Sequence, residues 1–121
     1  MVDLRQTSLK IIGEATFSYC NKLKTILFPE SIQTIGDYTF HKCTSLTKII
    51  LPKSIKQIGS GTFYDCFGLE TVDLRLTSLK IIGKETFSWC KKLTTILFPE
   101  SIETIGDQTD LFDRLGKDYF C

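Results

Sequence analysis

The run LTKIILPKSIKQIGSGTFYDCFGL, residues 46–69, decides the fold because its pattern recurs along almost the whole chain. An apolar triplet ends at a proline and is followed by Ser-Ile-x-x-Ile-Gly and then by Thr-Phe-x-x-Cys-x-x-Leu. The glycine recurs at spacings of 23, 23, 24 and 23 residues, at Gly13, Gly36, Gly59, Gly83 and Gly106. Self-similarity at such a period indicates a solenoid in which each unit packs only on its neighbours.

Three further apolar positions share the phase of the glycines. They are occupied by Phe17, Phe40, Phe63 and Phe87, by Cys20, Cys43, Cys66 and Cys90, and by Leu23, Leu46, Leu69 and Leu93. A longer repeat is superimposed, since 29 of the residues 1–37 recur unchanged in residues 71–107. Duplication of a three-coil block is the simplest account.

The apolar spacing changes within each unit, and this predicts the shape of one coil. The β-branched triplet predicts a short strand that the proline ends, because proline cannot donate to a ladder. A second extended piece leads to the glycine, and Thr-Phe-x-x-Cys has the spacing of one helical turn. We expect five stacked strands, at residues 2–4, 26–28, 49–51, 72–74 and 96–98. The serines at the corner, including Ser31 and Ser101, are expected to satisfy backbone groups between coils.

The predicted fold class is α/β: a right-handed leucine-rich-repeat solenoid of about five coils of 23–24 residues. A concave parallel sheet is expected on one side and short helical or 3-10 turns on the other. Residues 1–109 form the solenoid in this interpretation, and residues 110–121 form a tail. Asp110 is placed to cap a short helix with Leu111, Leu115 and Tyr119 on one face, which would cover the last coil.

The pattern resembles the leucine-rich repeats of BspA-like surface proteins of bacteria and parasitic protists. That family has L-P-x-S-I-x-x-I-G-x-x-A-F-x-x-C, and the likeness runs from about residue 2 to residue 109. Thr16, Thr39, Thr62, Thr86 and Thr109 stand where the family usually has alanine. The resemblance implies a location at the cell surface or outside the cell, and attachment to host proteins and other cells.

Composition favours a globular chain and excludes several kinds of partner. Hydrophobic residues make up 42%, and 15 Lys and Arg against 14 Asp and Glu leave a net charge of +1. We therefore expect no nucleic-acid partner, which would favour a concentrated basic face. We also expect no membrane insertion, because no apolar stretch approaches ~18 residues, and no signal peptide or anchor is seen in this chain.

The residues that carry chemistry elsewhere do not form a catalytic pattern here. The four repeat cysteines are predicted to be a buried core ladder, although disulfides between adjacent coils stay open as an alternative. Cys121 is expected to be exposed, and no cluster with metal-ligand spacing exists. His41, the only histidine, is expected on the solvated outer side of a turn. We predict no enzyme activity, no cofactor and no metal.

The candidate binding site is the outward face of the predicted concave sheet. Alternation along each strand gives it the partner-binding residues Thr25, Leu27, Lys48, Ile50, Thr71, Asp73, Thr95 and Leu97. Exposed Leu27, Ile50 and Leu97 would mark an interaction site, although single surface aliphatic residues also simply suit strands.

The sequence thus predicts a non-catalytic module that binds proteins, with host matrix or cell-surface proteins as the partners implied by the resemblance. Two alternatives stay open: an intracellular scaffold and a fragment of a larger repeat protein. Because the chain begins within a unit, we expect either further repeats before it or self-association through the uncapped N-terminal coil.

Overall fold

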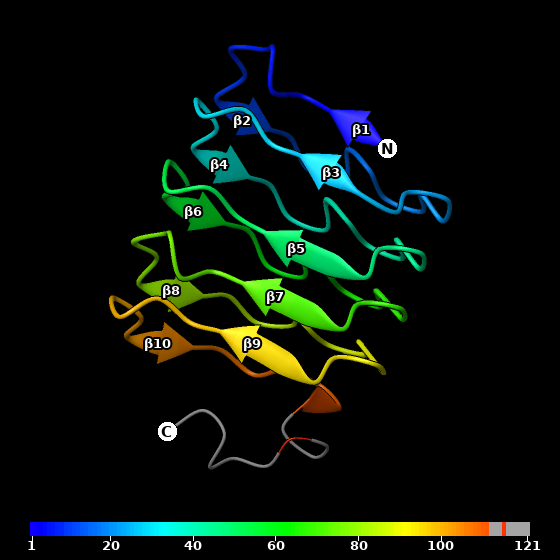
Figure 1. The fold of residues 1–121 in the computed structure, drawn as a ribbon. Coiled ribbons are helices and arrows are strands. Elements are labelled where there is room, and N and C mark those ends of the chain that lie inside the picture. The colour runs from blue at the N-terminus through cyan, green and yellow to red at the C-terminus, as the bar shows by residue number, and fades with distance from the viewer. Residues whose placement is uncertain (112–114, 116–121) are drawn as a thin grey trace.

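The computed structural model describes residues 1–111 and residue 115. Its coils stack in one direction, and each coil has two short strands, which a tight-turn segment follows in every described coil except the last (Figure 1). We number the coils 1 to 5 as residues 1–23, 24–46, 47–69, 70–93 and 94–111. The predicted parallel solenoid of about five coils is confirmed.

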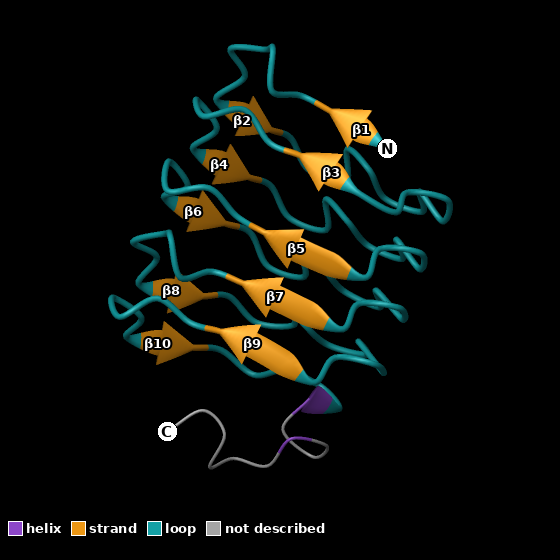
Figure 2. Cartoon of the chain, viewed as in Figure 1, coloured by secondary structure: helices purple, strands orange, loops and turns teal. Residues whose placement is uncertain are grey.

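The first sheet is made by the strands that the apolar triplets predict (Figure 2). They are β1 (Val2–Asp3), β3 (Ile26–Leu27), β5 (Lys48–Ile50), β7 (Thr71–Asp73) and β9 (Thr95–Leu97). All pairings are parallel and join equivalent residues, so Ile49 lies beside Val72 and Val72 beside Ile96. The strands β5, β7 and β9 each begin and end one residue earlier than predicted. Each therefore ends two residues before the proline or arginine that follows it.

A second parallel sheet lines the opposite arm of each coil, where the sequence predicts a second extended piece. Its strands are β2 (Ile11–Ile12), β4 (Thr34–Ile35), β6 (Gln57–Ile58), β8 (Ile81–Ile82) and β10 (Thr104–Ile105). The corner serines do bridge coils, since the Ser31 and Ser101 hydroxyls each donate to a carbonyl of the preceding coil at 2.6 Å. Ser54 departs from this pattern, because its buried Oγ has no partner.

The third side of the coil, which we call the turn face, comprises residues 14–22, 37–45, 60–68 and 84–92. Here the expected helical turn is replaced by successive tight turns, such as Ser18 N–H to Ala15 O and Cys20 N–H to Phe17 O. Left-handed residues such as Ala15 (φ 57°) and Tyr19 (φ 65°) interrupt the helix. These left-handed residues also direct every second backbone N–H toward the next coil. The N–H of Phe17, for example, donates to the carbonyl of Thr39 at 2.9 Å.

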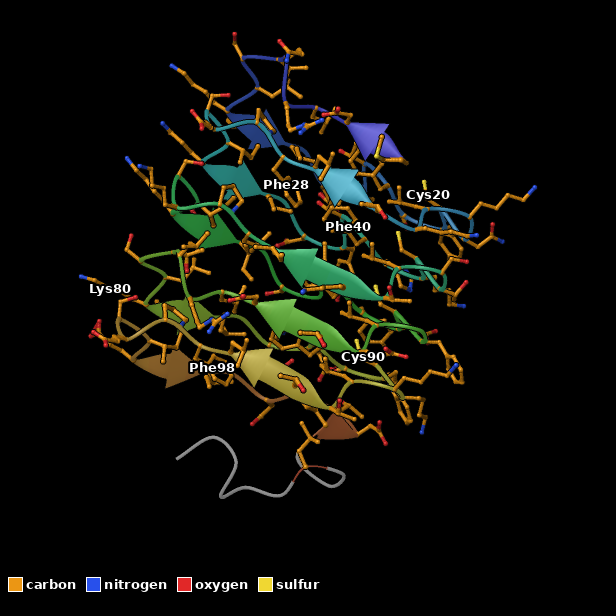
Figure 3. The ribbon with its side chains drawn as sticks, in the orientation of Figure 1. Cys20, Phe28, Phe40, Lys80, Cys90 and Phe98 are labelled. Carbon is orange, nitrogen blue, oxygen red and sulfur yellow. The ribbon has the colours of Figure 1, made fainter. Side chains whose placement is uncertain are left out.

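The core is a set of ladders between the three sides. Phe40 and Phe63 are fully buried and stack with nearly parallel rings, 5.3 Å between centroids, and Phe17 and Phe87 continue the stack. Beside it runs the cysteine ladder, which includes Cys20 and Cys90 in Figure 3. Each ring fills the space against the equivalent ring of the next coil, so the repeat itself specifies the packing.

Both sheets are interrupted once, at different levels of the stack. β3 does not pair with β5, and no backbone hydrogen bond joins residues 24–28 to residues 47–51. In the second sheet the interruption lies between β6 and β8, where the 23-residue coil 3 meets the 24-residue coil 4. Figure 1 shows wider gaps at both places, while the turn face stays hydrogen-bonded throughout.

The C-terminal end departs from the repeat at Gln108. Its side-chain oxygen accepts a hydrogen bond from the Phe87 N–H at 2.7 Å, and its side-chain NH₂ donates to Gly83 O and Gly106 O. The bond to Phe87 replaces the backbone hydrogen bond that joins the phenylalanine of each earlier coil to the next coil. Leu111 is fully buried against the core, and Leu115 packs there in part. The rest of the predicted capping helix, Tyr119 included, and the expected exposure of Cys121 lie outside the described residues.

Replacing Phe40 with alanine should lower the free energy of unfolding by about 3–5 kcal/mol, because the cavity would lie between two rings that cannot close it. Urea denaturation followed by circular dichroism measures the change. Lys53→Ala, at an exposed position, is the control. A loss below about 1 kcal/mol for Phe40→Ala would show that the ring stack does not hold the coils together.

Candidate functional site

The outward positions of the first sheet form two straight rows, because the strands pair without slippage. One row is Lys48, Thr71 and Thr95, and the other is Ile50, Asp73 and Leu97. The structure therefore brings six of the eight predicted residues together on β5, β7 and β9. Thr25 and Leu27 lie on the far side of the interruption between β3 and β5.

The three aliphatic residues on this face differ in exposure. Ile50 is 48% exposed and lies on the strand edge that faces the interruption. Leu27 and Leu97 are half-buried, so the expectation that all three are exposed holds only for Ile50. Of these three aliphatic residues, only Ile50, at the interruption, is exposed.

Asp73, in the middle of the second row, is already paired within its own coil. Arg75 donates to both of its carboxylate oxygens, at 3.0 and 2.8 Å, and its backbone N–H adds a third bond at 3.1 Å. These bonds lower the pKa of Asp73, and the same arrangement lowers the pKa of Asp3, bonded to Arg5, to about 2. The carboxylates on this face are thus ionised and neutralised by arginine.

A groove of about 460 Å³ opens where the first sheet is interrupted. Thr25, Leu27, Lys48 and Ile50, four of the predicted residues, line it. Its other walls are Arg5, Lys24, Ile26, Phe28 and Thr47. Phe28, labelled in Figure 3, is half-buried here, whereas Leu51 at the equivalent position is fully buried. The groove combines apolar walls with three basic side chains and no carboxylate.

Sequence reasoning missed a second surface on the turn face. It consists of Tyr19, Tyr38, His41, Tyr64, Phe67 and Trp89, which we call the aromatic strip. His41 is not simply solvated as expected, because it is half-buried with its ring 5.0 to 5.9 Å from those of three tyrosines. The signal in the sequence was the recurrence of aromatic residues at the variable positions around Phe-x-x-Cys.

The described cysteines are free and lie in one ladder, as predicted for a core position. Cys43, Cys66 and Cys90 are fully buried, and each thiol donates to the phenylalanine carbonyl of the preceding coil at 3.0 to 3.2 Å. Within residues 1–111 and 115, no three His, Cys, Asp or Glu side chains are grouped to hold a metal ion. What these surfaces can do chemically is bind other molecules through apolar, cationic and aromatic contacts.

A comparison with protein-family models matches residues 7–113 to the BspA type leucine-rich repeat region, with 6 copies. The chain belongs to the BspA-type leucine-rich repeat family. Leucine-rich repeats are generally non-catalytic modules that mediate protein–protein interaction, and the BspA-type repeats are typically surface-associated. No curated protein matches the chain in sequence.

Solved structures of leucine-rich repeat proteins share the fold. The T. pallidum protein is 28% identical with a TM-score of 0.61, over 89% of this chain and 66% of its own. The Bacteroides ovatus protein is 30% identical with a TM-score of 0.65, over 89% and 33%. A Eubacterium ventriosum protein, 20% identical with a TM-score of 0.63 over 82% and 40%, supports the fold alone. This BspA-type chain thus spans from one third to two thirds of the lengths of these proteins.

The buried thiols should resist alkylation in the folded protein. Burial raises the pKa of the Cys43 thiol to about 12, and burial also raises the pKa of the Cys66 thiol well above its ordinary value. The reactive thiolate is therefore scarce at both positions. Iodoacetamide at pH 8, followed by peptide mass spectrometry, should label both only after unfolding. Half-buried Cys20 is the internal comparison. Native labelling of Cys43 as fast as that of Cys20 would contradict this.

His41 should make the fold weaker in mild acid. Burial lowers its pKa below the ordinary 6.5, the nearby Lys42 lowers it further, and Asp65 opposes the shift. As the pH falls, the unfolded chain therefore takes up the proton before the folded chain does. The contribution of neutral His41 to the free energy of unfolding is complete above the ordinary pKa and is lost as the pH falls below it. Thermal unfolding between pH 5 and pH 8 measures it.

The control for this pH effect is His41→Tyr, which places at this position the residue that coil 3 carries as Tyr64. It retains an aromatic ring but does not titrate in this range, so the difference between the two pH profiles isolates the imidazole. Identical profiles would show that His41 makes no contribution.

Proposed function

We propose that this chain is an adhesion or recognition module at the cell surface, and that its first sheet binds a protein of another cell or of the extracellular matrix. The observation that carries this proposal is the groove between β3 and β5, where apolar and basic side chains meet on an unpaired strand edge. Its partner would present an extended, apolar segment with acidic residues.

The contacts in the groove suit such a segment for two reasons. Ile50 and Leu27 supply apolar surface that loses water on binding, and Lys24 and Lys48 attract carboxylates to the rim. A strand edge without partners also offers backbone groups to an added chain, as in binding by strand addition. Asp73 does not oppose an acidic partner, because Arg75 neutralises it.

The surface location rests on the family, whose repeats are typically surface-associated. No helix among the described residues is long and apolar enough to cross a membrane. An intracellular scaffold is the second candidate, favoured by free cysteines in a ladder of four, since cytosolic conditions keep thiols reduced. Antibody labelling of intact, unpermeabilised source cells separates the two locations.

Binding can be measured with the purified chain against immobilised, purified extracellular-matrix proteins. The double variant Ile50→Ser with Lys48→Glu should weaken binding at least tenfold, because it removes the central apolar contact and reverses a rim charge. Ile81→Ser is the matched control, as Ile81 is 61% exposed on the second sheet.

Equal weakening by both variants would show that the first sheet is not the binding surface. Absence of binding to every matrix protein, together with antibody labelling only in permeabilised cells, would overturn the adhesion role and leave the scaffold. A circular dichroism spectrum of each variant verifies that the fold is intact.

A further inference from the structure

Phe28 lies at the centre of the interruption between coils 2 and 3. No backbone hydrogen bond joins residues 24–32 to residues 47–55. Contact resumes directly after this stretch, where Gln33 O accepts the Lys56 N–H at 2.8 Å. The two coils are therefore apart only along this stretch, and Phe28 is its middle residue.

A buried hydroxyl without a partner marks the same gap as a departure from the repeat. Ser31 and Ser101 each donate to the carbonyl 22 residues before them, at 2.6 Å. The same offset would lead Ser54 to Ile32 O, but the buried Ser54 Oγ has no partner. Because leaving a buried polar group unpaired costs free energy, we looked for a contact that holds the coils apart.

The residue at the position of Phe28 distinguishes this pair of coils from the others. Leu4, Leu51 and Leu74 occupy the equivalent position in coils 1, 3 and 4, and the first strand of each of these coils pairs with that of the next coil. Coil 2 has phenylalanine there, and its β3 is unpaired on the side of coil 3. The equivalent Phe98 belongs to coil 5, the last described coil.

The ring of Phe28 is turned out of the phenylalanine stack (Figure 3). It meets the Phe40 ring at 88°, with centroids 6.3 Å apart, whereas the rings of Phe40 and Phe63 lie within 4° of parallel. Phe28 is half-buried and lines the groove, while Leu51 and Leu74 are fully buried. A ring in a place of leucine size forces the backbone to shift, so the ring takes up space that β5 needs to approach β3.

Charge repulsion across the groove is the competing explanation for the gap. Lys24 and Lys48 both line the groove and are exposed, and Arg5 is already bonded to Asp3. Repulsion between exposed ammonium groups is weak in water and is screened by salt. The aromatic ring, which cannot be screened, is the stronger cause.

We infer that Phe28 is a positioning residue that holds β3 and β5 apart, so that the groove of the first sheet is open because of its ring. This inference rests on the proposed function, since that groove is the proposed binding site. With leucine at this position, β5 would approach β3 and Ile50 would lose its exposure. The Lys48 N–H would then reach Lys24 O.

The neighbouring pair of coils provides the precedent for this closed arrangement. There the Thr71 N–H, equivalent to that of Lys48, donates to Thr47 O at 3.2 Å. Ser54 would gain its missing partner in the same movement. Closure therefore replaces several unpaired groups with hydrogen bonds, and the loss of the ring surface is offset.

Amide hydrogen exchange followed by NMR tests the inference directly. Phe28→Leu should slow exchange of the Lys48 N–H at least tenfold, because a bonded amide exchanges only when the strand opens. Phe28→Tyr keeps the ring and should exchange like the parent chain. Phe98→Leu is the matched control, since it makes the same substitution in coil 5 and should leave Lys48 unchanged.

Thermal unfolding separates a positioning role from simple filling of space. The melting temperature of Phe28→Leu should equal or exceed that of the parent chain, whereas removal of a ring that only fills a cavity would lower it. If the leucine variant does not fold, Phe28→Met gives the same comparison with another side chain that lacks the ring. Unchanged exchange of the Lys48 N–H in the folded variant overturns the inference.

Salt and binding complete the test. If about 1 M NaCl slows Lys48 exchange in the parent chain as much as Phe28→Leu does, repulsion between lysines holds the gap and the inference is overturned. Immobilised extracellular-matrix proteins are the binding probe. Slowed exchange with unchanged binding confirms the role of Phe28 and overturns the groove as the binding site. Lost binding with unchanged exchange overturns the role of Phe28 and leaves the binding site in place.

Discussion

The hydrogen-bonded turn face, with the phenylalanine stack behind it, is the contact on which the rest of the molecule depends. Both sheets are interrupted within the described chain, but the turn face joins every neighbouring pair of coils. Phe17, Phe40 and Phe63 each donate their N–H to the threonine carbonyl of the next coil, at 2.8 to 2.9 Å. Register is thus fixed at the turn face, and the rows on the sheets follow from it.

The sequence could predict whatever repeats and is buried. Phe40 and Cys43 recur in phase, and a recurring apolar residue in a solenoid must meet its equivalents. The positions of the strands follow from the same phase. The left-handed backbone of Tyr19 and Lys42 could not be predicted, because residues of these types ordinarily avoid positive φ angles. The hydrogen bonds between coils impose this conformation.

The two candidate surfaces were predictable from the sequence to different degrees. Outward positions on strands follow from alternation, so six of the eight predicted residues do share one sheet face. The interruption between β3 and β5 leaves no mark in coil length and could not be foreseen, although it creates the groove. The aromatic strip joins residues from different positions of the repeat, so their meeting depends on turn geometry that spacing does not reveal.

The duplicated block offers an internal test of what each position is for. All eight differences between residues 1–37 and 71–107 lie at positions that are exposed or half-buried in both copies, so the core has stayed constant while the surface changed. The charge at outward positions has changed freely, since Glu14 corresponds to Lys84 and the uncharged Ala15 corresponds to Glu85. Tyr19, however, corresponds to Trp89, so a strained, exposed position has changed residue and kept an aromatic ring. Packing does not demand that ring, because Lys42 and Asp65 occupy the same place in the other two coils.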